Sequence, residues 1–323
     1  MRSFSLFALS LSALTMPALA APPAVVADIP PVHSLVAAVM GDLGQPTLLL
    51  EAGANAHSYQ MRPADARALQ EAQLVFWIGP AMTPWLDRAV GSLGGKATAV
   101  TLLQAKGTFL RDFGTDEGHD HDHDHDHDHD HDHDHDHDDH AGAAHDGHDH
   151  SGLDPHAWLD PANARNWLGV IAAELARADP DNAAAYAANA ASAAEGIGAL
   201  DATLQAQLAP VRDKPFVVFH NAYGYFAGHY GLSVAGAVNL GDATAPGARH
   251  LADLKADLAA RNVLCAFPEA QHDPKQLTMV IEGTQTRLGG MLDPAGTTLP
   301  PGPGLYAALL GGMATTLTDC LGR

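Results

Sequence analysis

Histidine and aspartate alternate without a break from His119 to Asp138. Of the 21 histidines in the chain, 14 lie in or directly after this tract: His119, His121, His123, His125, His127, His129, His131, His133, His135, His137, His140, His145, His148 and His150. Neutral imidazole binds zinc, copper, nickel and iron well, and carboxylate adds charge and hard oxygen ligands. A purely solubilising acidic loop needs no histidine, so the composition favours capture of a transition metal.

The tract has no apolar side chain to bury, so we expect residues 115–151 to form a disordered, solvated loop. Its imidazoles should protonate near pH ~6.5, and capture should therefore fail in a mildly acidic medium. We interpret the loop as a weak, multivalent secondary metal site that collects metal or senses its abundance. Storage of metal is an alternative that the sequence leaves open.

Two histidines outside the tract lie near the ends of expected strands. His220 directly follows an apolar run at residues 216–219, and His57 lies in a Gly/Asn-containing loop after a run at residues 47–50. In open α/β sheets, ligands bind beyond the carboxyl ends of the strands. We therefore take both histidines as candidate metal ligands.

Two further candidates complete a possible coordination shell. Asp293 follows the short apolar run 291–292, and His156 lies in a turn with Asp154 and Pro155. Three imidazoles and one carboxylate form a suitable four-coordinate shell for zinc. We expect surface or structural roles for the other histidines: His33, His229, His250 and His272.

Apolar runs alternate with helical patterns along the rest of the chain, which is typical of βαβ units and a parallel sheet. The expected strands are residues 24–27, 47–50, 74–78, 98–102, 216–219, 234–238, 263–267 and 291–292. The expected helices are residues 33–41, 63–72, 84–90, 163–178, 181–208, 222–230, 248–261, 274–288 and 305–317. The two halves have no detectable sequence repeat, but both alternate expected strands with expected helices, which predicts two similar α/β lobes.

One predicted helix is longer than a single lobe needs. Residues 181–208 carry an apolar stripe in steps of three or four: Tyr186, Ala190, Ala193, Ile197, Leu200, Leu204 and Leu208. About 28 residues at ~1.5 Å each span roughly 40 Å. We expect an N-terminal lobe at residues 21–180, a stiff linking helix at 181–210 and a C-terminal lobe at 211–323.

Composition and charge restrict the compartment and the partners. The formal net charge of −21 is mostly local, because residues 116–150 contain 15 Asp and Glu and no Lys or Arg. The chain has no basic cluster, which argues against nucleic acid. Residues 1–20 have the pattern of a secretory signal peptide, and no other run approaches the roughly 20 apolar residues of a membrane span. We expect a soluble, exported mature protein.

The chain has two cysteines, Cys265 and Cys320. In an oxidising compartment such a pair more often forms a disulfide than a metal site. The bond would fasten the C-terminal segment to the last lobe. On the chain-entropy account, closing a loop of this length contributes roughly 4 kcal/mol.

Three histidine motifs stand in order along the chain: GANAHSYQMRP at residues 53–63, DPHAWLDP at 154–161 and FHNAYGYF at 219–226. With LDP at 292–294, they resemble the metal-binding solute receptors of bacterial ABC importers. The zinc branch of that family, which carries a His-rich loop in its first lobe, is the most similar. The resemblance covers essentially the whole mature chain. The zinc branch also resembles this chain in having paired cysteines near the end.

The resemblance implies an α/β fold of two (β/α) lobes with parallel-type sheets, joined by one long rigid helix, with metal in the interlobe cleft. It assigns His57 and His156 to the first lobe, and His220 and Asp293 to the second. The family's manganese receptors carry a carboxylate where this chain has His220, so the third imidazole favours zinc. Some zinc members carry Glu directly before the first ligand; Ala56 stands there in this chain, which leaves Asp293 or water for the fourth position.

The implied function is capture of Zn²⁺ in the periplasm of a Gram-negative bacterium and delivery to an inner-membrane ABC permease. We expect a monomer with no membrane span and no enzymatic activity. The sequence leaves open whether a periplasmic zinc chaperone loads the cleft. A manganese or iron receptor of the same family and a periplasmic zinc buffer or chaperone are the alternatives.

A zinc hydrolase is the alternative from a different class. No His-Glu-x-x-His motif is present, and no general base stands near the proposed ligands in the sequence. Glu269 and Glu282 are acidic residues of the second half, for which we expect surface or structural roles.

Overall fold

The computed structural model describes residues 21–93, 97–113, 152–240 and 246–323. The expected signal peptide and the whole His/Asp loop lie outside these ranges. Within them, no helix is both long enough and apolar enough to cross a membrane.

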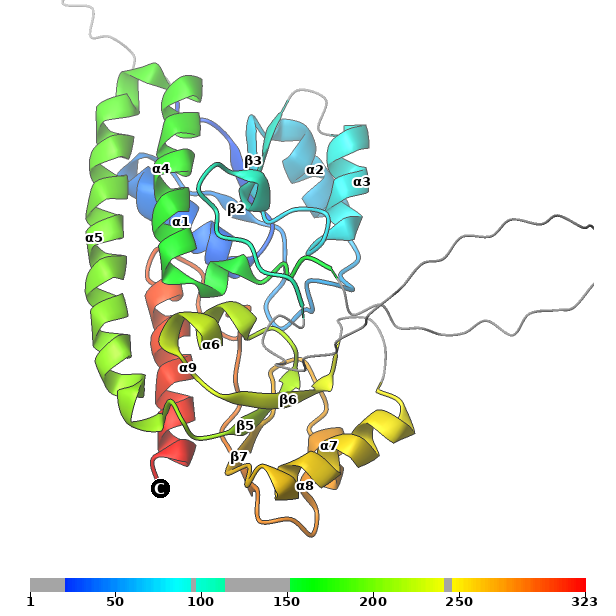
Figure 1. Ribbon diagram of the computed structural model, residues 1–323. Helices are drawn as coiled ribbons and strands as arrows, with labels where there is room; N and C mark the ends of the chain where they lie inside the picture. The colour runs from blue at the N-terminus through cyan, green and yellow to red at the C-terminus, as the bar shows by residue number, and fades with distance from the viewer. Residues whose placement is uncertain (1–20, 94–96, 114–151, 241–245) are drawn as a thin grey trace, which may run out of the picture.

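The described chain forms two four-stranded parallel sheets (Figure 1). The first sheet has the order β2-β1-β3-β4, with β1 Val25–Ala27, β2 Thr47–Leu48, β3 Leu74–Trp77 and β4 Thr98–Thr101. The second has the order β6-β5-β7-β8, with β5 Phe216–His220, β6 Val234–Asn239, β7 Cys265–Phe267 and β8 Arg287–Leu288. The strand order is the same in both halves, which confirms the prediction of two similar α/β lobes.

Helices connect and cover the strands: α1 Pro30–Met40, α2 Pro63–Glu71, α3 Pro84–Leu93, α4 Pro161–Ala178, α5 Ala183–Leu208, α6 Gly224–Tyr230, α7 Ala248–Ala260, α8 Lys275–Ile281 and α9 Leu305–Leu321. Each of α1 to α4 begins with proline, whose fixed φ suits the first helical position. The central strands β3 and β5 are buried along their whole length, as expected for parallel strands covered on both faces.

The sequence prediction was wrong around residues 274–288. Helix α8 ends at Ile281, and Gly283 adopts a φ of +76°, a left-handed conformation that favours glycine and interrupts the helix. The chain then forms β8, which pairs with β7. The expected strand at 291–292 makes only one bridge in the described chain, between Leu292 and Glu269.

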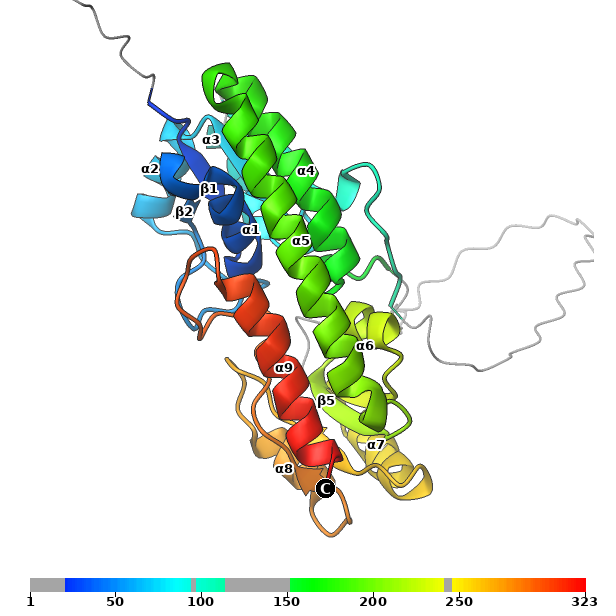
Figure 2. The same ribbon diagram turned by 90° about the vertical axis from the view of Figure 1, so that its left-hand side faces the viewer.

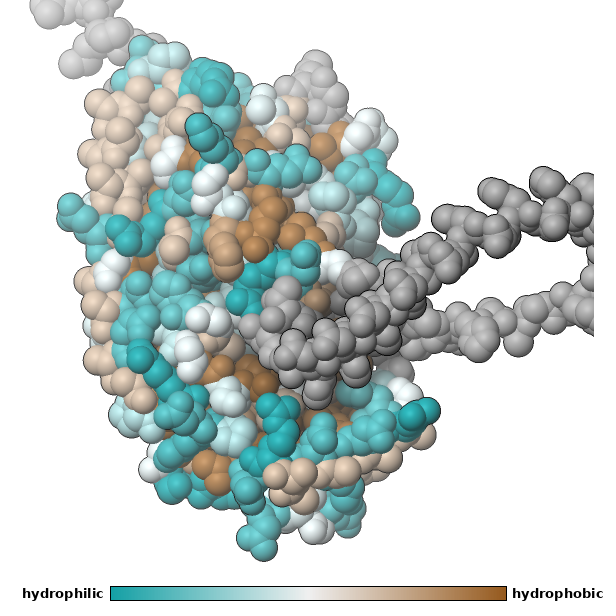
Figure 3. Space-filling model, viewed as in Figure 1, coloured by the Kyte–Doolittle hydropathy of each residue, from teal (hydrophilic) through white to brown (hydrophobic). Residues whose placement is uncertain are grey.

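Helix α5 is the long helix that the apolar stripe predicts. It packs against α4, α1 and α9, and Figure 2 shows it running along both lobes. Tyr186, Ile197, Leu204 and Leu208 of the stripe are buried. The outer face is rich in alanine, and the edge of the molecule along α5 is weakly hydrophobic in Figure 3.

Helix α9 is a second connection between the lobes. Near its start, the Ser34 hydroxyl of α1 donates to the Pro303 carbonyl at 3.1 Å and accepts the backbone N–H of Tyr306 at 3.0 Å. Near its end, Cys320 forms a disulfide with Cys265 of β7, which confirms the predicted bond. The C-terminal helix therefore belongs to the packing of both lobes.

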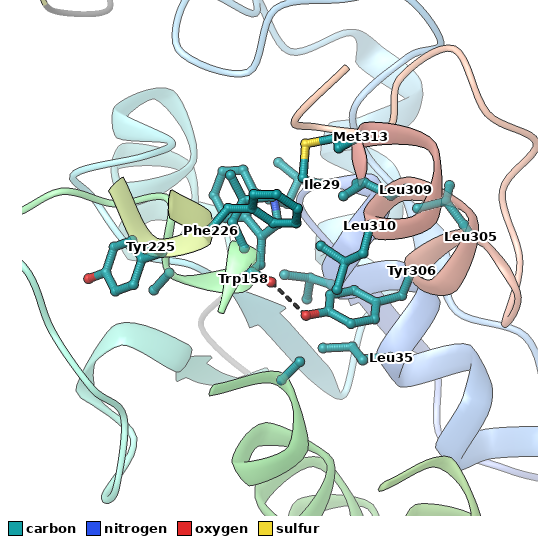
Figure 4. Packing of buried hydrophobic residues seen from close by; sticks show 14 of the residues in the cluster. Ile29, Leu35, Trp158, Tyr225, Phe226, Leu305, Tyr306, Leu309, Leu310 and Met313 are labelled. Carbon is teal, nitrogen blue, oxygen red and sulfur yellow. Dashed lines mark hydrogen bonds between the residues drawn. The ribbon is translucent and has the colours of Figure 1, made fainter. Parts of the chain in front are cut away.

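The two lobes share one hydrophobic core, in which Trp158 is completely buried. Figure 4 shows Trp158 among side chains from both halves: Ile29 and Leu35 from the first, and Phe226, Tyr306 and Leu310 from the second. The indole N–H of Trp158 donates to the Pro294 carbonyl at 2.8 Å, and the Tyr306 hydroxyl donates to the Trp158 carbonyl at 2.7 Å. Large rotation of one lobe against the other would break this packing.

Candidate metal centre

Three of the four predicted ligands come together between the lobes. His57, His156 and His220 each place a ring nitrogen within 4.8 Å of the others. Their ring centroids are 5.0 to 5.9 Å apart. A tetrahedral zinc ion with Zn–N bonds of about 2.0–2.1 Å needs nitrogens roughly 3.4 Å apart, so small side-chain movements suffice to bind it.

His57 lies in the loop between β2 and α2, which side-chain contacts hold in place. The backbone N–H of His57 donates to the Asn55 side chain at 2.9 Å, and the Trp85 indole donates to the Ala56 carbonyl at 2.8 Å. At the end of the loop, Arg62 and Asp65 form a reciprocal cap on α2. These contacts fix the chain on both sides of His57.

His156 lies just before the short 3₁₀ helix η3, Ala157–Leu159, and is almost completely buried. Asp154 accepts the backbone N–H of His156 at 2.9 Å, and the same carboxylate oxygen is 2.7 Å from the ring Nδ1. Donation from Nδ1–H to Asp154 leaves the lone pair on Nε2. Nε2 is buried and has no hydrogen-bond partner within the described chain, as expected of a nitrogen that binds a metal.

His220 is the last residue of β5, and a second carboxylate orients it. Its Nδ1 is 3.2 Å from Oε1 of Glu269, whose Oε2 accepts the Tyr223 hydroxyl at 2.9 Å. Burial, together with the negative charge of Glu269, raises the pKa of Tyr223 well above its ordinary value, so the phenol stays a donor. A carboxylate on one ring nitrogen and a metal on the other is a common arrangement in zinc sites.

Sequence reasoning assigned Glu269 no role at the site, although its position carried a signal. It follows β7, and β5 and β7 are neighbours in the sheet. At this point the strand order reverses, and residues beyond the carboxyl ends of the two strands meet in a crevice. In the first sheet a buried carboxylate follows β1, the strand equivalent to β5: Asp28 accepts the backbone N–H groups of Ile29 and Ile78. Burial raises the pKa of Asp28 to about 7.

The structure does not bring Asp293 into the group of three histidines. Its carboxylate accepts the backbone N–H of Thr297 at 3.1 Å, and the N–H and hydroxyl of Thr298 at 2.8 and 2.6 Å. The Thr297 carbonyl in turn accepts the N–H of Gly53, in the loop that carries His57. The side chain therefore organises a loop that contacts the first lobe.

The remaining described histidines lie outside the group. The Nε2 of His33 pairs with the Pro46 carbonyl, and burial lowers the pKa of this side chain. His229 lies between two aspartates, and His250 pairs with the Ala237 carbonyl. His272 stacks on Phe219, with its ring 6.2 Å from that of His220.

Known proteins are similar to this one along nearly the whole chain. A sequence model of the family described as "Zinc-uptake complex component A periplasmic" matches residues 25–320. The chain is 55% identical over 315 residues to the "High-affinity zinc uptake system protein ZnuA" of Paracoccus denitrificans, covering 98% of this chain and 97% of that protein. It is 41% identical to the protein of the same name from Brucella suis, covering 93% and 92%.

Solved structures agree with the fold. A structure described as "Crystal structure of ZnuA" aligns with a TM-score of 0.70 at 22% identity, covering 92% of this chain and 99% of that one. A solute-binding protein, FpvC of Pseudomonas aeruginosa in complex with Mn²⁺, aligns with a TM-score of 0.74 at 20% identity, covering 93% and 99%. The sequence match to the family model, supported by the two closely similar relatives, shows that the chain belongs to the family of periplasmic components A of zinc-uptake complexes.

Proposed function

We propose that this protein is the zinc-binding receptor of a bacterial zinc ABC importer, and that His57, His156 and His220 hold the transported Zn²⁺. The convergence of three imidazole nitrogens within 4.8 Å is the observation that carries the proposal. Membership of the zinc-uptake family and relatives named as zinc uptake proteins support the identity of the metal. Three nitrogen ligands also favour zinc over manganese, which prefers oxygen.

The site leaves one coordination position for a further group. The described carboxylate of Asp293 is engaged by Thr297 and Thr298, so we assign it to loop organisation and the fourth position to water. Asp154 and Glu269 hold the rings of His156 and His220 through their Nδ1 atoms. These two side chains select the nitrogen that each ring presents to the metal.

The filled receptor delivers zinc to an inner-membrane permease from the periplasm, where residues 1–20 direct it as a signal peptide. The periplasmic description of the family supports this location. We further propose that the protein acts as a monomer, and that residues 115–151 collect zinc weakly near the cleft. A periplasmic chaperone that loads the cleft is compatible with this scheme.

The same geometry argues for a receptor over an enzyme. The carboxylates that pair with the proposed ligands His156 and His220 are Asp154 and Glu269. Both are used to orient imidazoles, so neither is placed to activate a zinc-bound water. A manganese or iron receptor would be expected to use oxygen ligands in place of one imidazole. The proposed activity is therefore binding and release, without chemical conversion of a substrate.

Growth under zinc limitation tests the proposal. In a host without its own zinc receptor, the gene should restore growth in chelator-treated medium, and added zinc should remove the requirement. The variant His220→Ala should not restore growth. If added manganese or iron, and not zinc, removed the requirement for the gene, a manganese or iron receptor would be favoured. If the gene were needed only in zinc excess, a zinc buffer would be favoured. Either result would contradict a zinc importer.

A further inference from the structure

His229 lies between two carboxylates that come from different parts of the fold. Its Nδ1 is 3.0 Å from Oδ1 of Asp160, and its Nε2 is 2.9 Å from Oδ1 of Asp201. Asp160 caps the start of α4 in the first lobe by accepting the N–H of Ala162, whereas Asp201 lies on the linking helix α5. His229 itself is on α6, which begins four residues after His220 and lies beside the start of α4 in Figure 1.

The segment that contains Asp160 also carries His156. Residues 154–160 lie before α4, and groups from the second half of the chain hold them at several points. The Tyr225 hydroxyl donates to the Asp154 carbonyl at 3.2 Å, and the Tyr306 hydroxyl donates to the Trp158 carbonyl. His229 holds the far end of the same segment through Asp160.

We propose that His229 is a proton-dependent clamp that fastens the His156 segment to α6 and to the linking helix, and thereby positions His156 opposite His220 for zinc. The inference rests on the proposed function, because it concerns the same metal site. His229 does not contact the metal. It acts through Asp160, four residues after His156, and through its own helix, which follows His220.

Protonation decides how many bonds the clamp makes. A charged imidazole donates from both nitrogens and can hold both aspartates, whereas a neutral ring donates only once. The neutral ring then turns a lone pair toward the other carboxylate. The clamp is therefore complete only in the charged form.

The surroundings favour the charged form. The hydrogen bond to Asp160 raises the pKa of His229 above its ordinary value, burial opposes this, and the bond to Asp201 raises the pKa further. Further ionisable groups of the described chain near His229 and its two aspartates are Tyr225, Tyr230, Tyr306 and Arg111. Burial raises the pKa of the three tyrosines, so they stay neutral, and Arg111 lies beside Gly228 of α6.

The direction of the pH effect follows from the raised pKa. The stabilisation by His229 is complete below the unfolded pKa of about 6.5 and is lost as the pH rises through the higher folded pKa. Zinc ligands, by contrast, must be neutral to bind. Zinc binding should therefore be best in a window where the site histidines are neutral and His229 is still charged.

Three variants of the full-length protein test the clamp: His229→Phe removes both donors, His229→Arg keeps two donors with a permanent charge, and His250→Phe is the control. His250 is also a half-buried helical histidine, but its Nε2 faces a backbone carbonyl. Thermal unfolding of the metal-free proteins and competitive zinc titration are measured between pH 6.5 and pH 8.5. NMR titration of the His229 ring in the wild type reports its protonation directly.

His229→Phe should weaken zinc binding about three- to tenfold at pH 7.0, less than the 10–100-fold typical of direct partners of a ligand, because His229 is one step further away. The loss should shrink at pH 8.5, because the wild type then loses the clamp as well. His229→Arg stays charged, so it should match the wild-type zinc affinity at pH 7.0 and exceed it at pH 8.5. An equal loss at all pH values, a loss as large in His250→Phe, or a His229 ring that titrates at or below pH 6.5 would overturn the clamp. If the wild-type protein itself did not bind zinc tightly, the proposed function would be contradicted instead. The zinc titration of the wild type distinguishes this case.

Discussion

Two carboxylates orient the two buried histidines of the proposed metal site. Asp154 and Glu269 pair with Nδ1 of His156 and His220, at 2.7 and 3.2 Å respectively. They fix the tautomer, so that Nε2 faces the space between the three rings. Glu269 also receives the Tyr223 hydroxyl, which keeps its carboxylate oriented inside the protein.

Glu269→Gln should weaken zinc binding by about tenfold or more, the range expected when a metal ligand loses its hydrogen-bonded partner. The amide has nearly the shape of the carboxylate but carries no charge to polarise the imidazole. Competitive titration checks the result, with Glu282→Gln as the matched control, since Glu282 is exposed at the end of α8. Unchanged affinity in Glu269→Gln would show that the pair does not support the ligand.

Among single residues, the sequence predicted which histidines converge better than it predicted the side chains that orient them. His57 and His220 could be selected because each follows an expected strand, and His156 because of its turn and motif. Glu269 could not be assigned a role in the same way, because its use depends on β5 and β7 being neighbours in the sheet. Asp293 satisfied the strand-end rule, yet local N–H and hydroxyl donors of Thr297 and Thr298 engage its carboxylate.

The elements beneath the site are tied together by α9. Its disulfide to β7 closes a sequence separation of 55 residues, and Arg287 of β8 donates to the Cys320 carbonyl at 2.8 Å. These contacts hold the second sheet, at whose carboxyl end His220 and Glu269 lie, against α9. Hydrophobic periodicity predicted the strand β7 and the helix α9, but it could not predict that α9 would reach α1 in the other lobe.

Replacing both cysteines with alanine should lower the free energy of unfolding by about 4 kcal/mol, on the chain-entropy account for a loop of this size. Denaturant unfolding of the metal-free variant checks the value. Zinc affinity should change little, because Asp154 and Glu269, and not the disulfide, orient the proposed ligands His156 and His220. A large loss of zinc affinity with an unchanged free energy of unfolding would show that the disulfide supports the metal site and not the stability of the fold.

Element boundaries were predicted less well where the chain turns on single residues. The helix expected at 274–288 ends early because Gly283 takes a positive φ, and β8 forms by pairing with β7. A two-residue strand has no pattern of its own and exists only through its neighbour. The long α5 was predictable because its apolar stripe repeats over many turns.

Over the whole molecule, a shared core limits how far the lobes can move. Helices α5 and α9 both extend along the two lobes, and Trp158 is buried between side chains of both. Zinc is therefore expected to bind with local movement of the His57 loop and little rotation of the lobes. Such a receptor would signal occupancy through the surface near the cleft.

Small-angle scattering tests this expectation most clearly on a variant without residues 116–151. The radius of gyration should show no resolvable change when one equivalent of zinc is added. His220→Ala under the same conditions controls for effects of free metal. A marked compaction that requires His220 would show that the lobes close widely, against the stiffness inferred from α5 and α9.

The central claim is that the three converging histidines form the tight zinc site and the His/Asp loop only a weaker one. Competitive zinc titration of the mature protein beside His220→Ala, with the bound metal identified by mass spectrometry, tests it most directly. We expect one tight zinc site in the wild type, its loss in the variant and persistence of the weak sites. A variant that binds zinc as tightly as the wild type would show that the cleft is not the binding site.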